Sequence, residues 1–223
     1  MVGGLPGKVL GLLADLLHKL QQGVITEREL ELFVQRQHPF VISNIQEEWQ
    51  AFYQKYFRMT VDFSDVAIPD DPGGFDRVIY IPKRLTFAVV VKALRKKFKV
   101  YLYTENLDKD VVDNVRVADR NYAIRIRERQ EADEELKYLS ANQLKTRGDS
   151  IITLLERLVY ELKYYDETGQ HLDVQNWTLC AGSRYSGGLV PRVDWRSDGD
   201  KLRVSWSHPD HADARLRGRV VVS

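Results

Sequence analysis

The sequence is poor in sulfur-containing residues, since its 223 residues include one cysteine, Cys180, and two methionines. A single cysteine excludes an intramolecular disulfide, which fits a reducing compartment or a fold that needs no covalent cross-link. Cys180 lies in an apolar segment without a second thiol. We therefore interpret it as a small core residue rather than as a nucleophile.

Long apolar runs are also absent. None reaches the roughly 18 residues of a membrane span, and the N-terminus lacks the basic region and apolar segment of a signal peptide. We therefore expect no membrane span and a cytoplasmic location. Opposite charges nearly cancel, because the net charge is +1 although 29% of the residues are charged. Such a chain has no overall field that attracts nucleic acid or an anionic membrane.

The motifs of common enzymes are missing as well. The sequence contains no Gly-x-Ser-x-Gly turn, phosphate-binding loop, dinucleotide-binding fingerprint or His-Glu-x-x-His zinc motif. We therefore predict a protein that is not an enzyme and binds no cofactor. Its hydrophobic fraction of 43% is nevertheless sufficient to build a core in a chain of this length.

The N-terminal part of the chain has the apolar spacing of helices. Leucines at helical intervals predict a helix over residues 6 to 21, and Thr26 with Glu29 forms a capping box for a second helix that ends near Arg36. Five aromatic residues between Trp49 and Phe57 indicate a third helix with a core or interface face. Residues 1 to 59 are thus predicted to be helical, either as a cap on the main domain or as an association module for an oligomer.

The main domain, residues 60 to 223, is predicted to mix helices and strands. Pro69 to Gly74 has the composition of a linker, and Val61 to Ile68 is a candidate strand just before it. Capping residues Thr86 and Thr153 begin two predicted helices. Predicted strands cover residues 77 to 81, 100 to 103, 177 to 180 and a segment that begins at residue 121.

Two alternating runs near the C-terminus predict a β-hairpin with a tight turn at Ser197 to Asp200, whose Asp-Gly pair suits positive φ. One side of this hairpin is apolar and is expected to be buried, and the other is polar and is expected to be exposed. The apolar set is Val193, Trp195, Val204 and Trp206, and the polar set is Arg192, Asp194, Arg196, Arg203 and Ser205.

The last 42 residues have an unusual composition. From Gly182 onward the sequence contains 5 Asp but no Glu, and 7 Arg but one Lys, whereas the preceding part has 14 Asp, 13 Glu, 13 Arg and 12 Lys. Codons that end in C and are randomised at their first two letters produce Asp and Arg but never Glu or Lys. A preference of turns for Asp is the alternative explanation.

At these residues the chain resembles a known family. The segments ITLLERLVYELKYYDETGQHLDVQNWTLCAGSRYSGG, VPRVDW, LRVSW and LRGRVVVS are similar to variable proteins of diversity-generating retroelements, which occur in prokaryotes and their viruses. The resemblance is strongest over residues 121 to 223. It implies an α/β (α+β) fold, with a C-type-lectin-like (formylglycine-generating-enzyme-like) domain behind the N-terminal helical region. It also implies that exposed residues of about 182 to 214 are rewritten by mutagenic reverse transcription.

The predicted function is therefore noncovalent recognition of a protein or other macromolecular ligand by a diversified surface. The Ca²⁺-binding tripeptides of true lectins are missing, so calcium-dependent sugar binding is not expected. His208, Asp210 and His211 are metal-ligating residue types, but Pro209 disfavours a helical arrangement, and we assign no metal site. The predicted ligand-binding residues are Tyr185, Ser186, Leu189, Arg192, Asp194, Arg196, Arg203, Ser205, Ser207, His208, Asp210 and His211.

A nucleic-acid-binding module is the alternative function. It would use the alternating row Arg125, Arg127 and Arg129 together with the basic run of residues 95 to 99. We expect the row to form salt bridges with the acidic residues of 131 to 135 instead. We expect the basic run to be the solvated C-terminal end of a helix.

Overall fold

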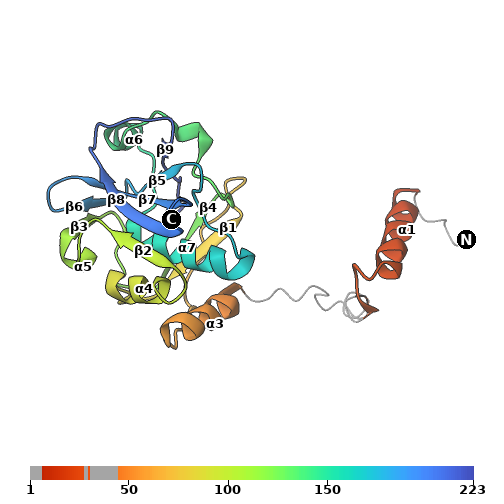
Figure 1. Cartoon of the computed structure of the whole chain (residues 1–223). Helices are drawn as coiled ribbons and strands as arrows, with labels where there is room; N and C mark the ends of the chain where they lie inside the picture. The colour runs from red at the N-terminus through yellow and green to blue at the C-terminus, as the bar shows by residue number, and fades with distance from the viewer. Residues whose placement is uncertain (1–6, 28–29, 31–44) are drawn as a thin grey trace, which may run out of the picture. The chain divides into compact units, whose positions relative to one another are not determined.

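The computed structural model describes residues 7 to 27, 30 and 45 to 223 (Figure 1). Contacts between Cα atoms divide the chain into two compact units, Met1–Glu48 and Trp49–Ser223. The smaller unit contains α1 (Gly7–Gln21), which confirms the first predicted helix. The second predicted helix, from Thr26 to Arg36, lies mostly outside the described residues.

The larger unit is a mixed α/β structure with three small sheets. A five-stranded sheet has the order β2 (Lys99–Leu102), β8 (Lys201–Ser207), β7 (Val190–Arg196), β5 (Trp177–Leu179) and β9 (Leu216–Arg217). The two-stranded sheets pair β1 (Arg77–Ile81) with β4 (Tyr122–Ile126), and β3 (Val111–Asn114) with β6 (Ser183–Tyr185). The helical segments of this part are α4 (Phe87–Leu94), α5 (Leu107–Asp110), η1 (Glu134–Leu136), α6 (Ala141–Arg147) and α7 (Leu154–Thr168).

The aromatic helix α3 (Ile45–Phe57) crosses the boundary between the two units, and its aromatic residues pack into the larger one. Trp49 and Tyr53 are buried, and the Tyr53 hydroxyl donates a hydrogen bond of 2.7 Å to the carbonyl oxygen of Tyr80 in β1. This packing confirms a core role for the stripe. It also joins Trp49–Phe57 to the larger unit, whereas the sequence suggested a helical region that ends at residue 59.

Local signals predicted correctly where the two capped helices begin. Thr86 caps α4, and Thr153 forms a capping box with Glu156 at the start of α7. α7 ends at Gly169, which adopts the left-handed conformation with φ 68° that glycine tolerates best. The candidate strand at residues 61 to 68 was wrong, because the chain there forms turns and loops.

The core behind the five-stranded sheet is charged as well as apolar. Arg157 and Glu161 of α7, together with Asp173 and Arg219, are at most 1% exposed. The Asp173 carboxylate accepts hydrogen bonds from Arg157 (Nε 3.0 Å, Nη2 2.8 Å), from Arg219 Nη2 at 2.6 Å and from the Thr178 hydroxyl. Arg157 also donates to Glu161 at 2.8 Å. Every buried charge in this network is therefore paired, which the interior of a protein requires.

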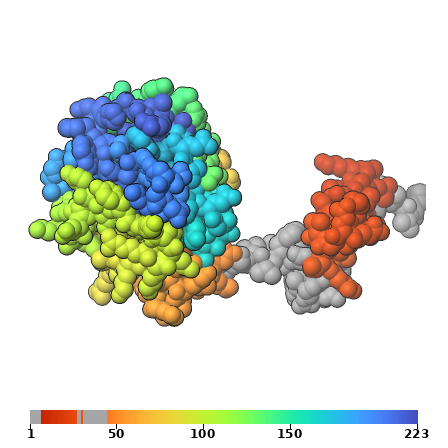
Figure 2. Space-filling model, viewed as in Figure 1, coloured from red at the N-terminus to blue at the C-terminus, as the bar shows by residue number. Residues whose placement is uncertain are grey.

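β7 and β8 form the predicted antiparallel hairpin in the interior of the five-stranded sheet. Val193 faces Val204, and Trp195 faces Leu202. All four are at most 7% exposed, as the alternation predicted. The turn differs from the expected one in a detail, because the non-glycine residue Asp200, with φ 47°, adopts the left-handed conformation. Blue C-terminal residues form a band across the visible face of the larger unit in Figure 2.

Candidate ligand-binding face

The polar side chains of the hairpin form one row, which we call the outer row. The strand register places Arg192 opposite Ser205, Asp194 opposite Arg203, and Arg196 opposite Lys201. Because side chains alternate along a strand, all six lie on the face opposite to Val193 and Val204. The predicted grouping of these polar residues is therefore confirmed by the register, although their exposure differs from one residue to the next.

Asp194 is buried, which corrects the expectation that it is exposed. Its residue surface is 1% accessible because the Arg203 guanidinium covers it, with Nε donating to Oδ1 at 3.0 Å and Nη2 lying 3.0 Å from Oδ2. Burial raises the pKa of the Asp194 carboxyl, although the hydrogen bond from Arg203 opposes the shift. The pair therefore acts as an internal support of the outer row.

Trp177 of β5 is a member of this face that the sequence did not indicate. Thr178 pairs with Val193, so the neighbouring Trp177 lies on the side of the outer row. Its ring centroid is 4.3 Å from the guanidinium carbon of Arg192, 4.2 Å from that of Arg215 and 5.8 Å from that of Arg203. Such cation–π contacts position arginines over the ring. The contact joins two segments distant in sequence, and no local pattern reveals it.

Arg192 differs from its two arginine neighbours in its partners. Arg203 is paired with Asp194, and Arg215 lies 3.5 Å from Asp213. Among the described residues no carboxylate lies within ion-pair distance of Arg192, and its buried Nε atom lacks a hydrogen-bond partner. Burial lowers the pKa of Arg192, and the charges of Arg203 and Arg215 lower it further, while the charges of Asp194 and Asp213 oppose the shift. Arg192 is thus a half-buried cation that forms no ion pair with a described residue.

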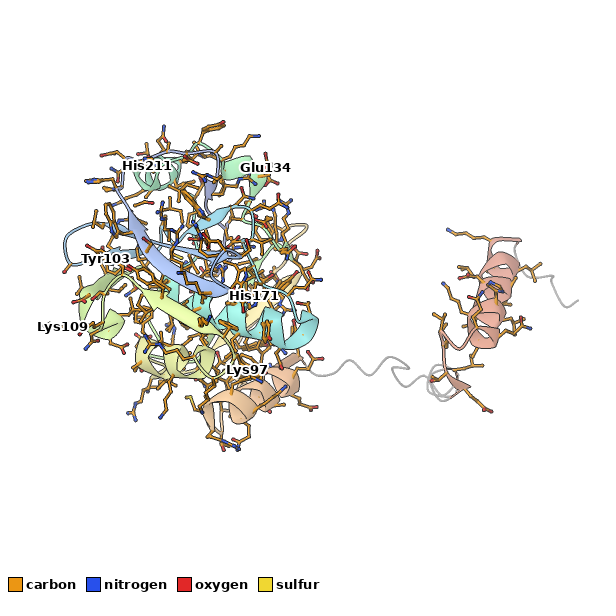
Figure 3. All side chains as sticks on the ribbon, viewed as in Figure 1. Lys97, Tyr103, Lys109, Glu134, His171 and His211 are labelled. Carbon is orange, nitrogen blue, oxygen red and sulfur yellow. The ribbon has the colours of Figure 1, made fainter. Side chains whose placement is uncertain are left out.

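Trp206 is exposed, which corrects its assignment to the buried set. It lies opposite Pro191 near the end of the hairpin and is 36% accessible. Its ring centroid lies 5.9 Å from that of Tyr103 and 6.2 Å from that of His208. At this end of β8 the core no longer covers the inner side of the strand, so alternation does not predict burial. Trp206 and Tyr103, which is labelled in Figure 3, provide exposed aromatic surface.

A pocket of about 330 Å³ lies beside Arg192 and contains several predicted site residues. Ser207 lines it but is 3% accessible, and its hydroxyl has no hydrogen-bond partner among the described residues. Buried polar atoms without partners are unusual. The lining residues are Arg192, Ser205, Trp206, Ser207, His208 and His211.

The remaining predicted site residues lie around this centre or away from it. Tyr185 is buried, at 5%, and packs on Tyr103, so it supports the face from within. Ser186 is exposed and Leu189 is half-buried, both in the β6–β7 connection. Arg196 lies at the turn end of the hairpin and pairs with Asp198 at 2.5 Å. Asp210 accepts a hydrogen bond of 2.6 Å from Asn142.

The described part of the chain contains no group of three or more His, Cys, Asp or Glu side chains placed to hold a metal ion. None of its helices is long and apolar enough to cross a membrane. Cys180 is fully buried, as expected of a core residue, and burial raises the pKa of its thiol.

The three arginines of the alternative function, Arg125, Arg127 and Arg129, bond to other groups of the same chain. Arg127 pairs with Asp133 at 2.9 Å and Arg129 with Glu135 at 2.8 Å, which confirms the expected salt bridges. Arg125 instead donates to the carbonyl oxygens of Pro69 and Phe75. The basic run begins at the C-terminal end of α4, where Arg95, Lys96 and Lys97 are exposed. The row therefore offers few free donors to a nucleic acid.

Comparisons of the chain with protein-family models, with curated proteins and with solved structures found no match.

Proposed function

We propose that this protein recognises a protein or other macromolecular ligand noncovalently through the outer row and the adjoining loops. In this proposal the larger unit is a C-type-lectin-like domain, and a mutagenic retroelement diversifies the exposed residues of about 182 to 214. The observation that carries the recognition function is the half-buried Arg192, which forms no ion pair with a described residue and lies at a pocket of about 330 Å³. The resemblance of the C-terminal segments to variable proteins supports the diversification.

The two sides of the hairpin support this proposal by their different chemistry. Val193, Leu202 and Val204 are completely buried, so they hold the hairpin on the core. The accessible residues next to the pocket are arginine, serine, histidine and tryptophan, and these side chains combine contact area with hydrogen-bonding groups. A change in these accessible residues alters what is bound without removing the buried contacts that stabilise the fold.

Noncatalytic recognition also agrees with the state of Cys180. A thiol must ionise to act as a nucleophile, and the raised pKa of this buried group opposes ionisation.

A pull-down from the cells or virus particles that carry the gene tests recognition. The bait is wild type or a variant in which six accessible residues are replaced together by residues of different chemistry. We expect this face variant to lose the wild-type partner while its melting temperature stays within a few degrees. The residues replaced are Ser186, Leu189, Arg192, Ser205, His208 and His211.

A matched control carries Arg95→Ser, Lys96→Ser and Lys97→Ser in the exposed basic run. We expect it to keep the wild-type partner. Loss of the partner from this control, with retention by the face variant, would refute the proposal and support the nucleic-acid-binding alternative. Diversification is tested separately by reading the DNA around the gene. A reverse transcriptase gene and a near-copy of the 3′ end that differs at adenines are expected, and a locus without both refutes that part.

A further inference from the structure

We propose that the pocket beside Arg192 binds a carboxylate, an Asp or Glu side chain on the surface of a protein ligand. The inference rests on the proposed recognition function and names the chemical group that this chain recognises. Arg192, Ser205 and Ser207 line the pocket from adjacent strands, and none of its lining side chains is acidic.

Two donors at this pocket lack acceptors in the described part of the chain. The Arg192 Nε atom and the Ser207 hydroxyl are both inaccessible to solvent and without a hydrogen-bond partner. A buried polar group without a hydrogen-bond partner destabilises the structure that contains it. They come from different strands, β7 and β8, yet they line one pocket. A movement of these side chains that turns the two donors toward the pocket would let a bound carboxylate accept hydrogen bonds from them.

The charge balance favours a single anionic group. Arg203 and Arg215 approach Asp194 and Asp213, respectively, whereas Arg192 has no such partner among the described residues. One guanidinium matches one carboxylate, because its planar fork donates two parallel hydrogen bonds. A carboxylate would also offset the repulsion that Arg192 experiences from the other two arginines.

The surroundings favour a protein over a nucleic acid as the source of the anion. The ring of Trp177, which lies on the same face as Arg192, has its centroid 4.3 Å from the Arg192 guanidinium carbon. Aromatic residues beside an arginine are typical of protein-binding hot spots. A nucleic-acid backbone needs a series of free cations to replace its counterions, and the neighbouring arginines of this face already approach carboxylates.

Selection from a displayed library of random peptides tests the inference. Immobilised wild type is expected to enrich peptides that contain Asp or Glu beside an apolar residue. For a selected peptide, Arg192→Ser is expected to weaken binding about 10- to 100-fold, because a charge-assisted pair is lost. The peptide's own Glu→Gln or Asp→Asn change should weaken binding to wild type similarly, and add little when Arg192 is already replaced.

Two further variants separate binding from folding. Ser207→Ala removes a hydroxyl that has no partner in the free protein, so its unfolding free energy should not fall, yet it should bind the peptide about 3- to 10-fold more weakly. Arg95→Ser, in the exposed basic run outside the outer row, should bind like wild type. Equal binding by wild type, Arg192→Ser and Ser207→Ala would overturn the inference.

The remaining outcomes distinguish this inference from the proposed function. Enrichment of peptides without acidic residues, whose binding the six-residue face variant abolishes, would overturn the carboxylate site and leave recognition by the face intact. Peptides that bind every variant equally, or no enrichment at all, would count against both. A fluorescent single-stranded oligonucleotide serves as the last probe. Binding that competes with the peptide and is weakened by Arg192→Ser would assign the pocket to phosphate and overturn the inference.

Discussion

Asp173→Asn is expected to be the most destabilising change of a single charge in the larger unit. The carboxylate is fully buried between two arginines and accepts hydrogen bonds from Arg157, Arg219 and Thr178. Asparagine keeps one acceptor oxygen and turns an amide group toward a guanidinium donor. Arg157 then keeps its bond to the carboxylate of Glu161, whereas Arg219 loses the carboxylate with which it pairs.

The expected loss follows from the buried position of these charges. Removing one partner of a buried ion pair typically costs about 3 to 5 kcal/mol, because the remaining charge stays desolvated. With a urea dependence near 2 to 3 kcal/mol per molar, the unfolding midpoint should fall by about 1 to 2 M. Urea unfolding followed by tryptophan fluorescence measures this shift, since Trp195 donates its backbone NH to the Asp173 carbonyl oxygen at 3.0 Å.

Glu135→Gln is the matched control. Its carboxylate pairs with Arg129 at 2.8 Å, but both side chains are more than 40% accessible, so the change should cost at most about 1 kcal/mol. Equal losses for the two variants, or a loss below about 1 kcal/mol for Asp173→Asn, would refute the view that the charged core stabilises this fold through its pairing.

A fall in pH should destabilise the protein by protonating the same carboxylate, Asp173. Burial alone raises the pKa of Asp173, but the charges of Arg219 and Arg157 outweigh it and hold the pKa below its ordinary value. The stability contributed by this group is therefore present above the unfolded-state pKa of about 4 and is lost as the pH falls through the folded-state pKa. Urea midpoints measured from pH 6 to pH 3 should fall more steeply for wild type than for Asp173→Asn. Parallel slopes would contradict this assignment.

Four further changes test the packing in and around the candidate face by denaturant unfolding. Trp195→Ala should lower the unfolding free energy by about 3 to 5 kcal/mol, because it deletes a buried ring that stacks on the imidazole of His171. Trp206→Ala should lower it by about 1 kcal/mol, because this ring is more exposed. A larger loss for Trp206→Ala than for Trp195→Ala would contradict the burial described above. Arg203→Ser should cost about 2 kcal/mol because it leaves a buried carboxylate unpaired, and a loss below 0.5 kcal/mol would show that this carboxylate finds other partners. Gly182→Ala should destabilise by about 1 to 3 kcal/mol, since its Cβ would lie 2.5 Å from a backbone oxygen, and a neutral result would show that this backbone relaxes.

Local patterns predicted the parts of the fold that local interactions determine. The capping box of Thr153 and Glu156 identified the start of α7, and alternation identified the pairing side of β7 and β8. Burial of Asp194 was missed because period-2 alternation separates two faces but does not show that a cross-strand arginine covers one of them. Exposure of Trp206 was missed because the pattern does not show where the core ends.

The contacts that complete the candidate face could not be predicted from the sequence, for a different reason. Trp177 and Arg215 are separated by 38 positions and meet through strand pairing between β5 and β9. The charged core likewise joins residues 157, 173 and 219. Such pairings depend on the complete chain path, which no spacing rule within one segment specifies.

The inner position of the hairpin affects what happens when its side chains change. β8 is hydrogen-bonded to β2 as well as to β7, and β7 is hydrogen-bonded to β5 as well as to β8. Neither strand has a free edge that could template aggregation with another chain. A slip of one residue would break ladders on both sides and move the apolar residues into water. Outer-row side chains other than the paired Asp194 and Arg203 can therefore change on a backbone whose alignment is fixed on both sides.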